Sequence, residues 1–180
     1  MALRKASAYS KKKVVPYTRK SNVQKKSFIK TVPPSKIVKF EMGDKAGYEK
    51  GKFKYSLKMM STEKVIIRDN SLEACRLVIY KVLEKNIPGQ YFFAIKVHPH
   101  HILRENKMLT GAGADRMQSG MQLSFGKTMG RGAIVNPGAE VFLIAIHSKK
   151  DVDITRKAIK SVRTKLPCKI KVIFEERGKK

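Results

Sequence analysis

The chain has 180 residues, 42% of them hydrophobic, which is enough for one domain of ordinary size with a packed core. Forty Lys and Arg oppose fourteen Asp and Glu, and the net charge of +26 indicates a polyanionic partner, usually a nucleic acid whose phosphates release counterions when they are neutralised. We expect neither a membrane span nor a secretory signal, because no segment reaches the roughly 18–20 apolar residues of a spanning helix and no apolar stretch follows the basic N-terminus.

Residues 1–35 are predicted to form an extended basic arm. The first 40 residues hold twelve Lys and Arg, and the first acid is Glu41. Because the segment has neither a helical nor a strand period, it cannot bury enough apolar surface to offset its own ordering entropy. We expect it to order on RNA; the alternative is a solvated tail. Its candidate RNA-binding residues are Arg4, Lys5, Lys11, Lys12, Lys13, Tyr17, Arg19, Lys20, Lys25 and Lys26.

Residues 36–176 are predicted to form the folded domain, and its first half combines strands with one helix. Four runs rich in apolar and β-branched residues predict strands. Before the last of them, apolar residues recur at helical spacing from Leu72 to Leu83, and a Pro-Gly pair marks the end of this helix. Asn70 and Glu73 have the spacing of a capping box at its start. The predicted strands cover residues 36–40, 55–60, 64–67 and 91–97.

The second half of the domain places further strands around a second helix. Residues 140–147 form a strongly apolar run, and 131–135 and 169–174 are shorter strand candidates. The helix opens near Ser148, which has capping-box spacing to Asp151, and the next proline ends it. Two helices packed on a mixed, largely antiparallel sheet make an α+β fold. The stripe that the second helix buries is predicted to contain Val152, Thr155, Ile159, Val162 and Leu166, and residues 177–180 form a charged tail.

The two cysteines are predicted to be structural. Cys75 and Cys168 lie far apart, each inside an apolar-periodic stretch, so we expect both to be buried, reduced and inert in a cytosolic protein. A structural zinc site needs about four clustered ligands, which two lone cysteines do not supply. We therefore predict no metal and no cofactor.

A segment that looks like a nucleotide-binding loop fails on spacing. Gly126, Lys127 and Thr128 match the end of a phosphate-binding P-loop, but the glycine that the motif needs five positions earlier is replaced by Met121. The glycine-rich residues that follow are also a poor helix start, so no helix dipole would hold a phosphate. Nucleotide hydrolysis is not predicted.

His98, His100 and His101 form a cluster that could be interpreted as a metal site. Because Pro99 favours an extended chain, His98 and His100 are expected to share a side that His101 does not. This geometry favours histidines that contact RNA over a bare metal site. A general acid–base role with Glu105 or Asp115 stays open, although nothing in the spacing supports it.

Residues 105–132 break the pattern of strands and helices. Six of the twelve glycines lie between Gly111 and Gly132, and a glycine-rich stretch of this length inside a domain is usually functional or disordered. Small residues let a backbone approach a ligand closely, and cationic side chains suit phosphates. We predict that residues 105–130 form an RNA-contacting loop; the alternative is an unbound surface loop.

The same region carries a family resemblance. His98-Pro99 to Arg104, Asn106 to Leu109, Gly113 to Arg116 and Phe125 to Lys127 closely resemble the universal large-subunit ribosomal protein family sixteen, in its archaeal and eukaryotic ten-e form. Residues 16–19, 32–40 and 133–174 are also similar to that family, so the resemblance covers nearly the whole chain.

The resemblance implies a hammerhead-type α+β fold wedged into rRNA near the central protuberance and the peptidyl-transferase centre. It implies that the long loop reaches toward tRNA in the A and P sites. Family members often have Arg where this chain has Gln122, which puts a phosphate contact at that position in doubt. The loop residues carried over are Lys107, Met108, Gly111, Gly113, Asp115, Arg116 and Gln118. The candidate rRNA contacts of the domain are His98, His100, His101, Arg104, Lys127 and Arg131.

Composition and resemblance together predict a structural constituent of the large ribosomal subunit in the cytoplasm, and not an enzyme. Its expected partners are rRNA, tRNA and neighbouring ribosomal proteins, with no membrane and no small-molecule substrate. The alternative is an RNA-processing enzyme that uses the three histidines. A membrane-surface protein would need a basic amphipathic helix, and the basic arm shows no such period.

Overall fold

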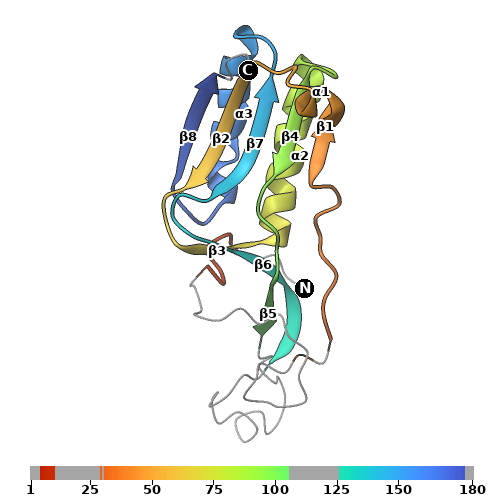
Figure 1. The fold of residues 1–180 in the computed structure, drawn as a ribbon. Coiled ribbons are helices and arrows are strands. Elements are labelled where there is room, and N and C mark those ends of the chain that lie inside the picture. Colours follow the sequence, from red (N-terminus) through yellow and green to blue (C-terminus); the bar gives the residue numbers. More distant parts are fainter. Residues whose placement is uncertain (1–4, 11–28, 30, 106–125, 177–180) are drawn as a thin grey trace, which may run out of the picture.

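A computed structural model of the chain describes residues 5–10, 29, 31–105 and 126–176 (Figure 1). Most of the predicted arm, the centre of the predicted loop and the charged tail lie outside these residues. The elements in chain order are β1 (Glu41–Gly43), α1 (Lys45–Glu49), β2 (Tyr55–Ser61), β3 (Val65–Arg68), α2 (Asp69–Asn86), β4 (Tyr91–Ile95), β5 (His101–Glu105), β6 (Lys127–Val135), β7 (Glu140–Ile146), α3 (Lys150–Ser161), the 3₁₀ helix η3 (Arg163–Lys165) and β8 (Ile170–Glu176).

The strands form two antiparallel sheets. The larger sheet has the order β1-β4-β7-β2-β8, and the smaller one has the order β3-β6-β5. The two long helices, α2 and α3, lie together behind the larger sheet, and β5 and β6 extend away from it (Figure 1). The predicted α+β fold with two packed helices and a largely antiparallel arrangement is confirmed, and α1 and η3 are additional short helices.

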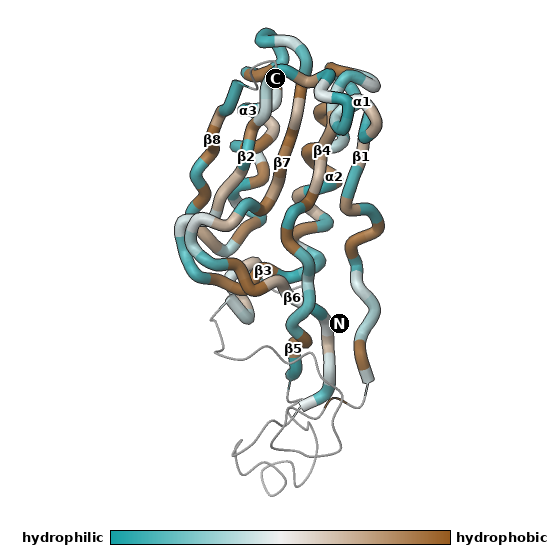
Figure 2. The backbone as a smooth tube through the Cα atoms, viewed as in Figure 1, coloured by the Kyte–Doolittle hydropathy of each residue, from teal (hydrophilic) through white to brown (hydrophobic). Residues whose placement is uncertain are grey.

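The main core lies between the larger sheet and the two long helices. Leu57 and Met59 of β2, Leu72 and Ile79 of α2 and Ile159 of α3 belong to one buried hydrophobic cluster. Strand β7 is buried from Val141 to Ile146, as expected for a central strand covered on both faces. Figure 2 shows hydrophobic residues concentrated along β3 and β7. On the opposite face, Tyr48 of α1 stacks on Phe92 at 4.3 Å between ring centroids and closes a second, smaller cluster.

Several of the expected strand and loop boundaries are wrong, because contacts between residues far apart in the chain override the local sequence pattern. Residues 36–40 form no strand, because their backbone donors bind side chains: Lys36 N–H donates to Asp69 (3.2 Å) and Val38 N–H to Glu73 (3.5 Å). Residues 127–130 belong to β6 and not to a loop, because β5 supplies a ladder partner for them. The glycine at 132 serves packing here, since a Cβ on it would lie 2.7 Å from a side-chain carbon of Ile66.

Neither predicted capping box forms. Helix α2 already begins at Asp69, its N-cap Arg68 makes no side-chain cap bond, and Glu73 bonds instead to Arg76 (2.8 Å). Helix α3 begins at Lys150 after an N-cap without a side-chain bond, and ends at Ser161, before η3 and Pro167. The buried stripe at Val152, Thr155, Ile159, Val162 and Leu166 is confirmed.

Both cysteines are free and buried, as predicted. Burial raises the pKa of the Cys75 thiol to about 12 and also raises the pKa of Cys168. Both thiols therefore stay protonated near neutral pH and are poor nucleophiles. Within the described ranges, no helix is long and apolar enough to cross a membrane.

Candidate nucleic-acid interface

The small sheet carries four of the predicted rRNA-contacting residues, namely His101, Arg104, Lys127 and Arg131. Its strands β5 and β6 pair so that Arg104 lies opposite Thr128 and Glu105 opposite Lys127. Arg104 and Arg131 are partly exposed, and Lys127 is exposed. The pairing thus sets three cations on the extension that carries the chain into and out of residues 106–125 (Figure 1). Such an arrangement suits phosphate groups, which cationic side chains bind without reading sequence.

Arg131 also connects this sheet to the end of the arm. Its Nε–H donates to the backbone oxygen of Pro33 at 2.7 Å. A guanidinium has five N–H donors, and this bond uses one of them. The segment around Pro33 therefore lies beside β6, so the last residues of the predicted arm and the loop-bearing sheet share one part of the surface.

The histidines alternate as expected from Pro99. His98 and His100 are exposed and the proline between them is buried, whereas His101 is only 2% exposed. The His98 ring lies 5.3 Å from the ring of Phe40, and Nδ1 of His100 lies 2.9 Å from the His98 backbone oxygen. Two rings are thus available to a partner. His101, at the start of β5, is buried, so its ring is not exposed to an RNA partner.

No metal-binding cluster is found in the part of the chain that the structure describes. Groups of three or more His, Cys, Asp or Glu side chains that would hold a metal ion are absent there. The three histidines point to different environments, and the thiols are protonated.

The junction between β3 and α2 holds both described pieces of the N-terminal segment. Arg68 donates through Nη2 to the backbone oxygen of Lys5 (2.7 Å), and Ile66 N–H donates to Ser10 O (3.1 Å). One residue further on, Asp69 accepts the N–H of Lys36. Because Lys5 is itself exposed, this anchoring presents its ammonium group at the surface.

The sequence analysis missed a second cationic surface, on α3 and the residues after it. The available signal was the apolar stripe itself, because a helix that buries one face exposes the cations on the other. The exposed cations are Arg156, Lys157, Lys160, Arg163, Lys165 and Lys169.

The remaining predicted site residues lie outside the described residues. In the arm these are Arg4, Lys11, Lys12, Lys13, Tyr17, Arg19, Lys20, Lys25 and Lys26. In the loop they are Lys107, Met108, Gly111, Gly113, Asp115, Arg116 and Gln118.

Comparison with known proteins gives a consistent result. The sequence profile of the family described as ribosomal protein L16p/L10e matches residues 12–173. Large ribosomal subunit protein uL16 of Staphylothermus marinus is 40% identical over 97% of this chain and 95% of the relative. The proteins of the same name from Hyperthermus butylicus and Sulfolobus acidocaldarius are 43% and 38% identical, over 84% and 96% of this chain and 79% and 93% of the relatives. The chain therefore belongs to the ribosomal protein L16p/L10e family, in its archaeal type.

Proposed function

We propose that this chain is a structural, non-enzymatic constituent of the large ribosomal subunit in the cytoplasm. Within the subunit it binds rRNA near the central protuberance and the peptidyl-transferase centre. Through residues 105–130 it helps to position tRNA in the A and P sites. Family membership supports the ribosomal role, and the resemblance of the 98–127 region supports the location.

The observation that carries the proposal is the β5–β6 extension. It projects from a well-packed domain and carries Arg104, Lys127 and Arg131 at the ends of the 106–125 connection. A rigid scaffold that presents a long connection in this way is typical of binding loops. The domain then serves as the rRNA-bound base, and the loop as the part that meets tRNA.

The roles of individual residues follow from their chemistry. Arm cations neutralise rRNA phosphates, as do Arg104, Lys127 and Arg131, which fixes the position of the protein without reading base sequence. His98 and His100 donate to or stack on RNA. Loop residues Lys107 and Arg116 lie near tRNA. The peptidyl-transfer chemistry is left to RNA, and no side chain of this chain is assigned to it.

Reconstituted subunits test this proposal. Lys107→Ala and Arg116→Ala are each compared with Lys81→Ala, which changes an exposed cation on α2. We expect all three proteins to enter subunits, and only the loop variants to weaken tRNA binding and slow peptide synthesis. If the loop variants enter subunits that translate like wild type, the tRNA role is wrong and the protein only stabilises the rRNA structure.

The alternative of an RNA-processing enzyme gives a different result. An enzyme would turn over RNA at catalytic concentration, whereas this protein is expected to bind stoichiometrically and leave the RNA intact. Cleavage that is lost in a His98→Ala/His100→Ala variant would favour the enzyme.

A further inference from the structure

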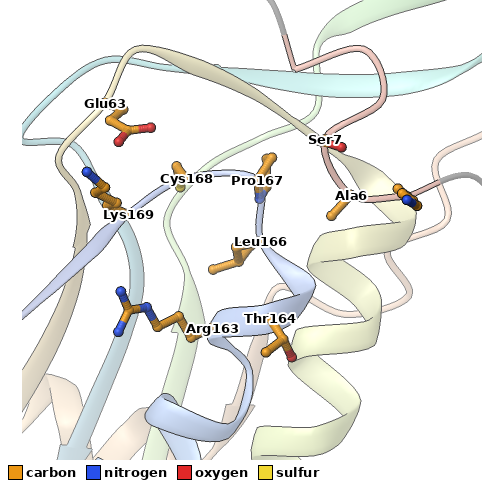
Figure 3. A pocket seen from close by; sticks show the side chains of 10 residues that line it. Ala6, Ser7, Glu63, Arg163, Thr164, Leu166, Pro167, Cys168 and Lys169 are labelled. Carbon is orange, nitrogen blue, oxygen red and sulfur yellow. The ribbon is translucent and has the colours of Figure 1, made fainter.

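A surface groove separates the N-terminal turn from the segment that follows α3. It has a volume of about 670 Å³ and is lined by residues 5–7, Glu63 and residues 163–169, Lys165 excepted. Figure 3 shows Glu63 and Lys169 at one end, Ala6 and Ser7 at the other, and residues 166–168 between them. A volume of this order suits a drug-sized or nucleotide-sized ligand.

The floor and the rim of this groove differ in chemistry. Leu166 and Cys168 are buried, and together with Ala6 and Pro167 they form an apolar floor. The cationic side chains of Lys5, Arg163 and Lys169 stand on the rim. An apolar surface flanked by cations is complementary to a nucleotide, whose base is flat and weakly polar and whose phosphate is anionic.

Hydrogen bonds fix both walls of the groove. Arg68 holds the Lys5 backbone oxygen at 2.7 Å on one side. On the other side, Ser71 Oγ donates to the Lys165 backbone oxygen, and the hydroxyl and N–H of Thr62 both donate to the Lys169 oxygen, at 3.1 and 3.2 Å. Both walls are therefore held by hydrogen bonds from Arg68 of β3, Ser71 of α2 and Thr62, which follows β2.

The rim cations have no acidic partner within the described residues. The ion pairs there involve Lys45, Lys52, Lys58 and Arg76, which lie on α1, β2 and α2 or next to them. Their charges are already compensated. The three rim cations form no such pair, so an approaching phosphate gains more here than at the paired cations.

Glu63 adds a feature that a simple anion site would lack. Its carboxylate lies at the rim beside Lys169 and would repel a polyanion that offered phosphates alone. A carboxylate instead accepts hydrogen bonds from the amino groups of bases. A ligand that carries both a phosphate and an amino-bearing base satisfies Glu63 and the rim cations together.

We propose that this groove seats one nucleotide of an RNA strand, with the base over the apolar floor and its phosphate at the rim formed by Lys5, Arg163 and Lys169. This inference rests on the proposed function, because it assigns a further contact surface to the same RNA-binding protein. It adds the C-terminal half of the domain to a binding surface that the arm and the β5–β6 extension otherwise provide.

Lysine footprinting on the full chain tests the proposed nucleotide-binding groove directly. The protein, free and bound to a large-subunit rRNA transcript, is acetylated, and the modification of each lysine is measured by mass spectrometry. We expect RNA to protect Lys169, while Lys81 and Lys85 on α2 stay reactive. Lys169 decides the outcome, because protection of Lys5 also follows from RNA contacts of the neighbouring arm.

Control ligands separate a nucleotide seat from an anion patch. Polyphosphate has phosphates without bases, and AMP is a free nucleotide. At matched phosphate concentration we expect neither to protect Lys169 as well as RNA does. Equal protection by polyphosphate means an anion patch, and equal protection by AMP means a free-nucleotide site; either result overturns the proposal.

A double variant gives an independent readout. Arg163→Ala/Lys169→Ala removes two of the three cations around the single phosphate of the seated nucleotide, so the log–log salt slope of rRNA binding is expected to fall by about 0.7, the value for one neutralised phosphate of a single strand. The matched control, Lys81→Ala/Lys85→Ala, removes two exposed cations from α2 and is expected to leave the slope unchanged. If rRNA binds and protects the arm lysines while Lys169 stays reactive, the groove proposal alone is wrong. If the protein does not bind rRNA at all, the proposed function fails with it.

Discussion

Glu73 and Arg76 form an ion pair on helix α2, and Glu73 also joins the helix to the segment that precedes β1. Arg76 donates to Glu73 at 2.8 Å from Nε, and Glu73 also accepts the N–H of Val38. The two side chains are only 15% and 9% exposed. We predict that Glu73→Ala strongly destabilises the fold, because it leaves a guanidinium charge that is largely buried and unpaired.

The size of the expected destabilisation follows from the burial of the Glu73–Arg76 pair. Removing one partner of a buried pair costs about 3–5 kcal/mol, and the residual exposure of this pair places the expected cost near about 3 kcal/mol. The chain supplies its own control in Glu41 and Lys45, a pair at 2.7 Å whose side chains are 46% and 58% exposed. Glu41→Ala is expected to cost far less than Glu73→Ala, because solvent screens that pair.

Urea unfolding of the two variants measures this difference. The variant Glu73→Ala/Arg76→Met is expected to recover part of the lost stability, since it leaves no unpaired charge. Equal costs for Glu73→Ala and Glu41→Ala would refute the assignment of Glu73–Arg76 as a buried stabilising pair.

The same pair predicts a pH dependence. The hydrogen bond from Arg76 lowers the pKa of Glu73 from its ordinary value of 4.5. The unfolded chain therefore binds a proton here more readily than the folded one, so this contribution is complete above about pH 4.5 and is lost as the pH falls toward the folded pKa. The stability gap between wild type and Glu73→Ala is expected to narrow over that acid range. A gap that widens below pH 4.5 would contradict this explanation.

Three further predictions concern the core, the small sheet and the arm. Ile144→Ala, at a fully buried position of β7, is expected to lower the unfolding free energy by about 2–5 kcal/mol and to reduce incorporation into subunits, as read by urea titration and by sedimentation. Gly132→Val is expected to destabilise more than Gly130→Val in thermal melts, because a Cβ at 132 meets Ile66 at 2.7 Å whereas one at 130 has 3.8 Å to Asp69; equal melting would contradict the close packing of β6 on β3. Deleting residues 1–30 is expected to flatten the log–log salt slope of rRNA binding by about 4–5, if about half of the arm cations neutralise phosphates, and an unchanged slope would make the arm a spectator.

The sequence by itself determined the features that depend on local periodicity and on composition. The spacing from Leu72 to Leu83 identified α2, and the apolar run at 140–147 identified β7, because the buried face of an element repeats with the period of its backbone. Net charge indicated a polyanionic partner, and the burial of both cysteines followed from their apolar surroundings. The motifs around His98 and Gly113 pointed to the family that the comparisons then showed.

Tertiary structure alone decided the features that join distant residues. The segment at 36–40 looks like a strand, yet carboxylates 33 and 35 residues further along take its backbone donors. Residues 127–130 look like a loop, yet they pair with β5 because the fold brings that strand alongside. The proposed groove combines Lys5, Glu63 and Lys169, which no spacing in the chain relates. They meet because Arg68 and Thr62 bind the backbones of two distant segments, and hydrogen bonds of this kind leave no periodic trace in a sequence.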